Sequence, residues 1–509
     1  MTDWFSRRAQ ALRYPSKAGR AAIFVLCIVG FIFTGLSWSL ASAPGGSPDD
    51  DFHLASISCP DWPKPVPCKT RLHNGQIEKQ VPGFIAEIGC YAAKAGKSAA
   101  CLKPATKVSH AWRARYDQGQ YPRGYYQFHH LIAGNQVYAS IVPMRMLNFS
   151  IALVLLGLLL WFSPARLRTA FFLATLGAWV PMGLFLIASN NPSSWAITGT
   201  AVYALGLYAA IQSEGRNRVV LAVLSAVGAV LCFTSRGDAA FYVLVCSLAV
   251  WILNGEYRKN RNLLVYSLIA SVLGLVVMLS TGQSGNINAD YTVPGGPKPS
   301  ALGKIFSLVI SAPRLFFGLW GIENGPGWLD VKLSYVEAAS TMIVLAIIVA
   351  FGIGSMTRRK FLALVIVLGA ILGIPFVMLF RRGDHLMQLY QSRYVLPLLV
   401  LALFILLLPT ATQLLDRVVV IEVLAVVLMI AAASSSLYSV IQRFVVGMDK
   451  PGAGLNPALG WWWDIPLLPK VLWLMGALGF FVGASLAYWL SKMNRSEIIE
   501  RSQSEVAAE

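Results

Sequence analysis

Long apolar runs separated by short polar loops dominate the chain. Each run is roughly 17–22 residues long, the length of helix that crosses a bilayer core of about 30 Å. The runs are continuous rather than alternating, so they predict helices and not the strands of a membrane barrel. We predict about twelve membrane spans, at residues 21–41, 144–162, 170–188, 195–213, 219–234, 239–254, 263–280, 335–355, 361–380, 395–412, 418–440 and 469–490.

The composition agrees with this pattern. Hydrophobic residues make up 56% of the 509 residues and charged residues only 13%. An ordinary soluble protein carries about twice that share of charged residues. The predicted fold class is therefore an all-α polytopic membrane protein.

Basic residues in the short loops predict the orientation of the helices. Loops on the cytoplasmic side are enriched in Lys and Arg. With the predicted spans, the basic clusters all fall on one side: Arg7, Arg8, Arg13, Lys17, Arg20, Arg166, Arg168, Arg216, Arg218, Arg258, Lys259, Arg261, Arg358, Arg359 and Lys360. Both termini are then cytoplasmic. The net charge of +18 is mostly this topology signal, and no nucleic-acid-binding pattern accompanies it.

This orientation divides the chain into cytoplasmic, membrane and extracytoplasmic parts. The parts are the cytoplasmic N-terminus 1–20, the first helix 21–41, an extracytoplasmic loop 42–143, helices two to seven at 144–280, a second extracytoplasmic loop 281–334, helices eight to twelve at 335–490, and the cytoplasmic tail 491–509. The second of these loops contains an apolar stretch that ends at Trp320. A thirteenth span there would invert every later loop, so we predict an interfacial or re-entrant helix.

Four of the seven cysteines, Cys59, Cys68, Cys90 and Cys101, lie in the loop 42–143. An even number of cysteines in an oxidising compartment predicts two disulfides. Of the three possible pairings, proximity in sequence favours Cys59 with Cys68 and Cys90 with Cys101. Free thiols or a metal site are the alternatives, although no histidine has zinc-ligand spacing.

Three acids and a histidine follow the first apolar run directly. They are Asp49, Asp50, Asp51 and His53. Groups held at the boundary between solvent and hydrocarbon can have their proton affinities changed by desolvation and by one another. The alternative interpretation is a solvated acidic loop.

A second set of polar residues is predicted on the same side of the membrane. It comprises Arg236, Arg382, Gln391, Arg393, Tyr394, Tyr125 and His129. Arginines on the outer side oppose the usual charge bias and therefore need an explanation. Ion pairs with Asp238 and Asp384, snorkelling toward headgroups, and capture of a phosphate by the guanidinium fork all remain open.

Together, the acids and the arginines suggest a glycosyl transfer reaction at the outer membrane face. Nucleotide sugars are not generally available there, so the donor would be a polyprenyl-phosphate sugar already in the membrane. A carboxylate would take the proton from the acceptor hydroxyl, and the arginines would stabilise charge on the leaving phosphate.

Several short motifs in this order resemble a family of bacterial multipass proteins, domain of unknown function family 2142. The string Pro48–His53 is similar to the P-D-E-x-x-H signature of its first outer loop, and the segment 391–397 resembles its Q-G-R-Y-x-x-P. Three further segments fit in order: Arg145–Asn148, Ser189–Pro192 and Gly327–Asp330. Asp50 stands where the family usually has Glu, Asp51 where it has Pro, and Ser392 where it has Gly.

The family is similar in architecture to the GT-C membrane glycosyltransferases. The resemblance implies a bacterial plasma-membrane enzyme whose catalytic carboxylate is Asp49, with Asp50 and His53 orienting that base or the acceptor. The departures from the motif leave the choice among Asp49, Asp50 and Asp51 open. Three acids could also hold a divalent cation, Mg or Mn. The acceptor would be an envelope glycan or glycolipid, by analogy alone.

Two other functions compete with this interpretation. A lipid or polysaccharide transporter or flippase is compatible with twelve helices, but transporters usually place ionisable groups at the bilayer midplane. A lipid-linked polysaccharide ligase would also use outer arginines, with its main outer loop expected late in the chain. The interpretations share a membrane partner and exclude nucleic acid.

Overall fold

The computed structural model describes residues 17–60, 68–102, 110–282, 300–408, 415–450, 454–456, 461–463 and 465–506. Within these ranges, eleven helices are long and apolar enough to cross a membrane. They are α2 (Lys17–Ala41), α7 (Val137–Phe162), α10 (Ser193–Ile211), α11 (Gly215–Ser235), α12 (Gly237–Asn254), α13 (Arg261–Ser280), α14 (Ala301–Leu319), α15 (Tyr335–Gly354), α16 (Arg358–Arg382), α18 (Leu415–Val445) and α19 (Pro469–Val506). The predicted fold class, an all-α polytopic membrane protein, is confirmed.

Two of the predicted spans are interrupted or short. The span predicted at 170–188 is two helices, α8 (Ala165–Trp179) and α9 (Met182–Ile187). The span predicted at 395–412 is a 3-10 turn, η6 (Leu396–Leu398), continued by α17 (Leu399–Leu407), and residues 409–412 lie outside the described ranges. These helices are almost entirely buried among other helices. A break in a helix is tolerated at membrane depth where protein rather than lipid surrounds it.

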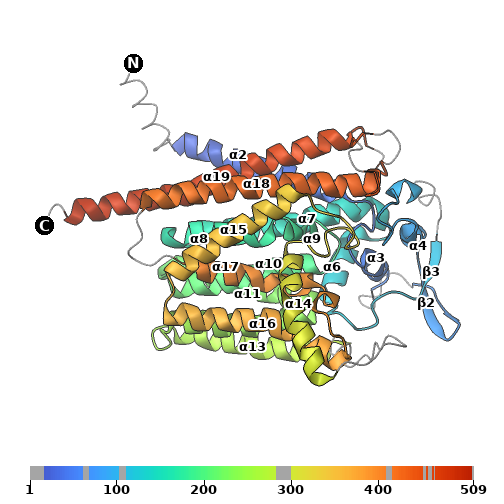
Figure 1. Cartoon of the computed structure of the whole chain (residues 1–509), viewed down its shortest axis with the longest axis horizontal. Coiled ribbons are helices and arrows are strands. Elements are labelled where there is room, and N and C mark those ends of the chain that lie inside the picture. The colour runs from blue at the N-terminus through green and yellow to red at the C-terminus, as the bar shows by residue number, and fades with distance from the viewer. Residues whose placement is uncertain are drawn as a thin grey trace, which may run out of the picture.

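Helix α14 occupies the stretch predicted to be interfacial. It is long and apolar enough to count among the eleven candidate spans. In Figure 1, however, α14 runs across the direction of the neighbouring helices. Its outward face is apolar, with Leu302, Phe306 and Ile310 exposed. This orientation agrees with a helix that lies along the membrane surface.

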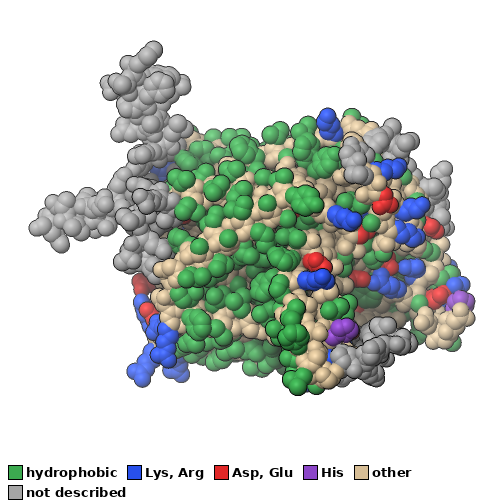
Figure 2. Space-filling view, in the orientation of Figure 1, with side chains coloured by type: hydrophobic (Ala, Val, Ile, Leu, Met, Phe, Trp, Pro, Cys, Tyr) green, Lys and Arg blue, Asp and Glu red, His purple; other side chains and the backbone are tan. Residues whose placement is uncertain are grey.

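The long helices run roughly parallel, so the bundle has two distinct ends (Figure 1). The end that carries α3, α6 and the sheet is called the loop end here. Helix α2 begins at the opposite end and α19 runs back to it. Figure 2 shows hydrophobic side chains over the middle of the bundle and charged side chains gathered at its two ends.

The basic loops predicted on one side of the membrane share the end opposite the loop end. These loops join α7 to α8, α10 to α11, α12 to α13 and α15 to α16. Arg7, Arg8 and Arg13, which belong to the same prediction, lie outside the described residues, as does the Gly/Pro-rich part of the loop 281–334. The common end of the remaining clusters agrees with the predicted sidedness.

The loop between α2 and α7 folds into a small mixed subdomain at the loop end. Its elements are α3 (Asp50–Ser58), β1 (Thr70–His73), β2 (Gln76–Pro82), α4 (Phe84–Glu87), η1 (Ile88–Cys90), η2 (Ala99–Cys101), β3 (His110–Arg113) and α6 (Gly124–Ala133). The strands form an antiparallel sheet in the order β1-β2-β3, with His73 opposite Gln76 and Val81 opposite Ala111.

This sheet is not among the predicted elements, although the sequence contains a local signal for it. Asn74 and Gly75 join β1 to β2, and both have positive φ, 49° and 74°. An Asn-Gly pair between two short strands is a strong hairpin signal because both residues tolerate that conformation. Both predicted disulfides are confirmed: Cα–Cα distances are 5.8 Å for Cys59–Cys68 and 6.4 Å for Cys90–Cys101.

Arg443 ties this subdomain to the bundle. Its guanidinium lies at the end of α18, is fully buried and binds both Asp330, at 2.7 and 3.0 Å, and backbone carbonyls of the 91–97 segment. The carbonyls are those of Tyr91, Lys94 and Lys97. One side chain therefore holds the Gly327–Asp330 turn and the disulfide-bonded segment against α18.

We predict that Arg443→Met destabilises the protein by about 3–5 kcal/mol, because removing one partner of a buried ion pair leaves the others without a donor. Thermal unfolding in detergent should show a clear fall in Tm. Arg258→Met is the control, since Arg258 is exposed at the opposite end of the bundle. An equal Tm for the two variants would contradict this role of Arg443.

Candidate functional site

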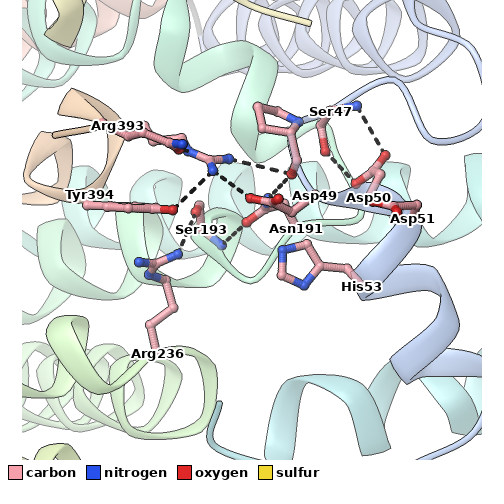
Figure 3. Close-up of polar contacts among 12 residues, drawn as sticks. Ser47, Asp49, Asp50, Asp51, His53, Asn191, Ser193, Arg236, Arg393 and Tyr394 are labelled. Carbon is pink, nitrogen blue, oxygen red and sulfur yellow. Dashed lines mark hydrogen bonds and ion pairs between the residues drawn. The ribbon is translucent and has the colours of Figure 1, made fainter. Parts of the chain in front are cut away.

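Three consecutive acids at the start of α3 point into three different environments (Figure 3). Asp49 is the residue before the helix and has a left-handed backbone, with φ 62°. Asp50 and Asp51 follow in the first turn. Successive side chains diverge by about 100° around a helix, so neighbouring carboxylates do not share partners unless a long side chain bridges them.

Asp49 faces the segment that precedes α17. Its carboxylate accepts a hydrogen bond from Nη2 of Arg393 at 2.8 Å and another from Nη2 of Arg115 at 2.5 Å. Burial by itself would raise the pKa of Asp49, but the charge of Arg393, its hydrogen bond and the charge of Arg115 hold that pKa well below its usual range. Asp49 is therefore ionised at neutral pH, and 29% of its side-chain surface remains exposed.

Asp50 is fully buried and serves a different set of contacts. The backbone N–H of Ser47 donates to it at 3.2 Å, the Ser47 hydroxyl also donates to it, and Nη2 of Arg145 lies 3.5 Å away. Burial raises the pKa of Asp50, against the opposing effects of Arg145 and Ser47. The position suits a structural carboxyl group better than one that meets a substrate.

Arg145 connects this carboxyl group to the end of α2. Its guanidinium is fully buried and donates to the carbonyls of Ser39, Ser42 and Ala43 at 2.8–2.9 Å. The last carbonyls of a helix lack partners within the helix, and a cation there is favourable. Arg145 thereby fixes the path of the chain from α2 into the acid cluster.

Asp51 and His53 complete the start of α3. Asp51 accepts hydrogen bonds from Arg115 and, at 3.1 Å, from Arg113. His53 is buried, with Nδ1 2.8 Å from the hydroxyl of Tyr126. Burial lowers the pKa of His53 to about 3, with Arg393 and Arg236 acting in the same direction and Asp49 in the opposite one. His53 is consequently neutral at pH 7 and can orient neighbouring groups only as an uncharged ring.

Arg393 is held by several groups at once. It lies in the 3-10 turn η5 (Ser392–Tyr394), and only 2% of its side chain is exposed. Its Nε donates to Gln391 Oε1 at 2.7 Å, and Nη2 donates to the Tyr394 hydroxyl at 3.2 Å as well as to Asp49. The structure therefore brings four of the predicted residues, Asp49, Gln391, Arg393 and Tyr394, into one group.

Arg236 lies on the other side of the Tyr394 ring. Its guanidinium is 4.4 Å from the ring centroid, and it binds both carboxylate oxygens of Asp238, at 2.6 and 2.9 Å. The ion pair with Asp238, one of the alternatives left open above, is what the structure contains. The ring lies between Arg236 and Arg393 (Figure 3), so the two guanidiniums and their carboxylate partners, Asp238 and Asp49, form one continuous polar layer.

The remaining predicted binding residues lie farther from this layer. Tyr125 and His129 are fully buried in α6, where His129 Nε2 is 3.0 Å from Asn148 Oδ1 and Asn148 donates to the Tyr125 hydroxyl at 3.1 Å. Both side chains are closed off from solvent and bind Asn148. Arg382 ends α16, is partly exposed and lies close enough to Tyr390 to affect it electrostatically.

Four residues of the site are not among the predicted site residues, although three of them carried a signal in the sequence. Arg113 and Arg115 are basic residues in a loop predicted to be extracytoplasmic, where the charge bias makes arginine unusual. Asn191 belongs to Ser189–Pro192, one of the segments that resemble the family, whereas Ser193 gave no signal. In the structure Asn191 donates to the Pro48 carbonyl at 2.8 Å, and the Ser193 hydroxyl accepts from Arg236 at 3.4 Å.

The described residues provide no ligand set for the divalent cation, Mg or Mn, that the sequence led us to consider. In the part of the chain that the structure describes, no three His, Cys, Asp or Glu side chains lie close enough to hold a metal ion. Each of the three acids is instead engaged by an arginine. The arrangement places a proton acceptor, Asp49, beside the guanidiniums of Arg393 and Arg115. Guanidiniums bind anions, so the site suits an anionic ligand.

Comparison with known proteins identifies the family of this chain. No curated protein and no solved structure matches the chain. The sequence profile described as predicted membrane protein (DUF2142) matches residues 31–402, which include the acid cluster, Arg145, Arg236 and Arg393. This match covers well over half of the chain, which therefore belongs to the DUF2142 family of predicted membrane proteins.

Proposed function

We propose that this protein is a membrane glycosyltransferase similar to the GT-C enzymes. It would transfer a sugar from a polyprenyl-phosphate donor to a cell-envelope glycan or glycolipid on the extracytoplasmic face of the bacterial plasma membrane. The observation that carries the proposal is the meeting of Asp49 with Arg393, at 2.8 Å, at the loop end of an apolar helical bundle. A proton acceptor and an anion-binding guanidinium are the two groups that this reaction needs.

The sidedness of the bundle supports an extracytoplasmic site. The basic loops share the end opposite the site, and such loops are cytoplasmic in most membrane proteins. The disulfides Cys59–Cys68 and Cys90–Cys101 lie in the subdomain at the site's end, and disulfides persist in oxidising compartments. Outside the cytoplasm, a lipid-linked sugar supplies the activated donor that a nucleotide sugar supplies inside.

The reaction is a substitution at the anomeric carbon of the donor sugar. The acceptor hydroxyl oxygen forms a bond to that carbon, and the bond from the carbon to the phosphate oxygen breaks. Its electron pair stays on the phosphate, where guanidiniums stabilise the added charge, and the hydroxyl proton passes to the Asp49 carboxylate. General base catalysis of this kind contributes about 10²–10⁴-fold. The phosphate is already a good leaving group and needs no general acid.

The distribution of charge favours this proposal over the transporter and flippase alternative. Asp49 and Asp51 lie at the start of α3, at the loop end of the bundle (Figure 1), and their ion pairs place Arg115 and Arg393 beside them. Transporters usually bind their substrates near the bilayer midplane, between repeats. A lipid-linked polysaccharide ligase would use a similar site, and the identity of the donor in the transfer assay separates it from the proposed enzyme.

We predict that Asp49→Asn lowers transfer at least about 100-fold, because an amide cannot accept the acceptor's proton. The measurement is sugar transfer by purified protein from synthetic polyprenyl-phosphate sugars, together with glycan analysis of envelopes from cells with matched protein levels. Glu214→Gln is the control, since Glu214 is exposed at the opposite end. Normal transfer and an unchanged glycan profile in Asp49→Asn would remove Asp49 as the base.

The pH dependence of transfer gives a second test. Because the folded-state pKa of Asp49 lies below its usual value, Asp49 stays deprotonated as the pH falls to its ordinary pKa of about 3.9. We therefore predict that kcat/KM does not fall between pH 8 and about pH 5 through titration of this base. A loss with an apparent pKa between 6 and 7, retained in His73→Gln as an exposed-histidine control, would identify a different base.

A further inference from the structure

Arg115 is the exposed guanidinium of the site. About 45% of its side chain is accessible, against 2% for Arg393 and 5% for Arg236. The two buried arginines are each bound to an acid, and Arg393 is further engaged by Gln391 and Tyr394. A ligand that approaches from the loop end therefore meets Arg115 before either of them.

Arg115 can also leave both of its carboxylate partners without leaving either of them unpaired. Its guanidinium bridges Asp49 and Asp51. Asp49 keeps Arg393 at 2.8 Å, and Asp51 keeps Arg113 at 3.1 Å, if Arg115 moves away. If Arg393 moved away from Asp49 instead, its nearly buried guanidinium would have no acid to pair with, which is costly.

The backbone around Arg115 is anchored, so the movement is confined to its side chain. The next two residues are fixed to the subdomain: the Tyr116 hydroxyl donates to the Ile77 carbonyl at 3.2 Å, and the Asp117 N–H donates to Ser56 Oγ at 2.8 Å. Arginine has a long side chain with several rotatable bonds. The ring of Phe52, 5.8 Å from the guanidinium, gives it an apolar surface along which to turn.

We propose that Arg115 captures the phosphate of the lipid donor by exchanging its two carboxylate partners for that anion. This inference rests on the proposed function and assigns Arg115 as the residue that makes the first contact with the donor. The guanidinium fork matches the geometry of two phosphate oxygens as well as that of a carboxylate.

The exchange links donor binding to the strength of the base. Arg115 is one of the groups that hold the pKa of Asp49 low, so its departure raises the proton affinity of that carboxylate. Asp49 is then a weak base before the donor arrives and a stronger one in the presence of the bound phosphate. The acceptor proton is accepted only when a donor is in place.

The alternative is that Arg115 has a structural role alone and stabilises the packing of the segment after β3 against α3. In that case its loss would lower stability and leave the affinity for phosphate unchanged. The two roles are separated by binding measurements on the full-length protein in phosphatidylcholine nanodiscs, with a radiolabelled long-chain polyprenyl monophosphate as the probe. The same titration with inorganic phosphate as a competitor shows how much of the affinity comes from the phosphate group alone.

For Arg115→Gln we expect binding of the polyprenyl monophosphate to weaken about 10-fold or more, the usual loss for a hydrogen bond between charged groups. Arg115→Lys keeps the charge without the fork and should lie between that variant and wild type. Arg71→Gln is the matched control, because Arg71 is 44% exposed and paired with Glu78 in the same subdomain. Its affinity should stay within about twofold of wild type, given the small contribution of exposed pairs.

A second readout follows Asp49 directly. Carbodiimides modify protonated carboxyl groups, so we expect polyprenyl monophosphate to increase labelling of Asp49 in wild type, measured by peptide mass spectrometry. In Arg115→Gln the labelling should be higher without the ligand and should not change when it is added. Equal affinity and equal labelling in Arg115→Gln and wild type would overturn the inference.

The outcomes also separate this inference from the proposed function. If wild type does not bind polyprenyl monophosphate, the donor class is wrong and both proposals fail. If wild type and Arg115→Gln bind it equally and both transfer sugar, the proposed function stands and the role of Arg115 is disproved. If Arg115→Gln does not fold, the comparison of Arg115→Lys with Arg71→Gln decides the matter on the same two readouts.

Discussion

The ion pair between Asp49 and Arg393 is the contact on which the rest of the site depends. It joins residues 344 positions apart, one just before α3 and one just before α17. Arg393 is almost completely buried, and a buried charge without a partner is costly. The turn at 47–50 and the turn at 391–394 must therefore dock together for either to be stable. Their docking brings the proton acceptor beside the cations.

Arginines bound to backbone carbonyls make this docking rigid. Arg145 binds three carbonyls at the end of α2, and Arg443 binds three in the disulfide-bonded segment. A guanidinium has five N–H donors and no acceptor, which suits it to a chain end where carbonyls lack partners. Each of these arginines also binds one acid. The loop end of the bundle is thus assembled around buried guanidiniums rather than around an apolar core alone.

Environment separates three acids that are adjacent in sequence. Burial raises the pKa of Asp50, whereas the surrounding cations lower the pKa of Asp49. Asp50 serves the structure through Ser47 and Arg145, and Asp49 is left partly exposed beside Arg393 and Arg115. Arg115 binds Asp49 and Asp51, and each of these acids is also paired with a second arginine, Arg393 or Arg113. That second pairing allows Arg115, the most exposed of these arginines, to bind an incoming anion.

The helical membrane fold, the common end of the basic loops and both disulfides could be predicted from the sequence, because they depend on run length, charge bias and proximity along the chain. The Asn74–Gly75 hairpin was also readable. Two features are visible only in the folded structure: which acid faces Arg393, and the bridge that Arg115 forms between Asp49 and Asp51. The fold also buries Tyr125 and His129 within α6 and its neighbours. Pairing between distant residues depends on how helices pack, and identical side chains in one turn differ only in the neighbours that packing gives them.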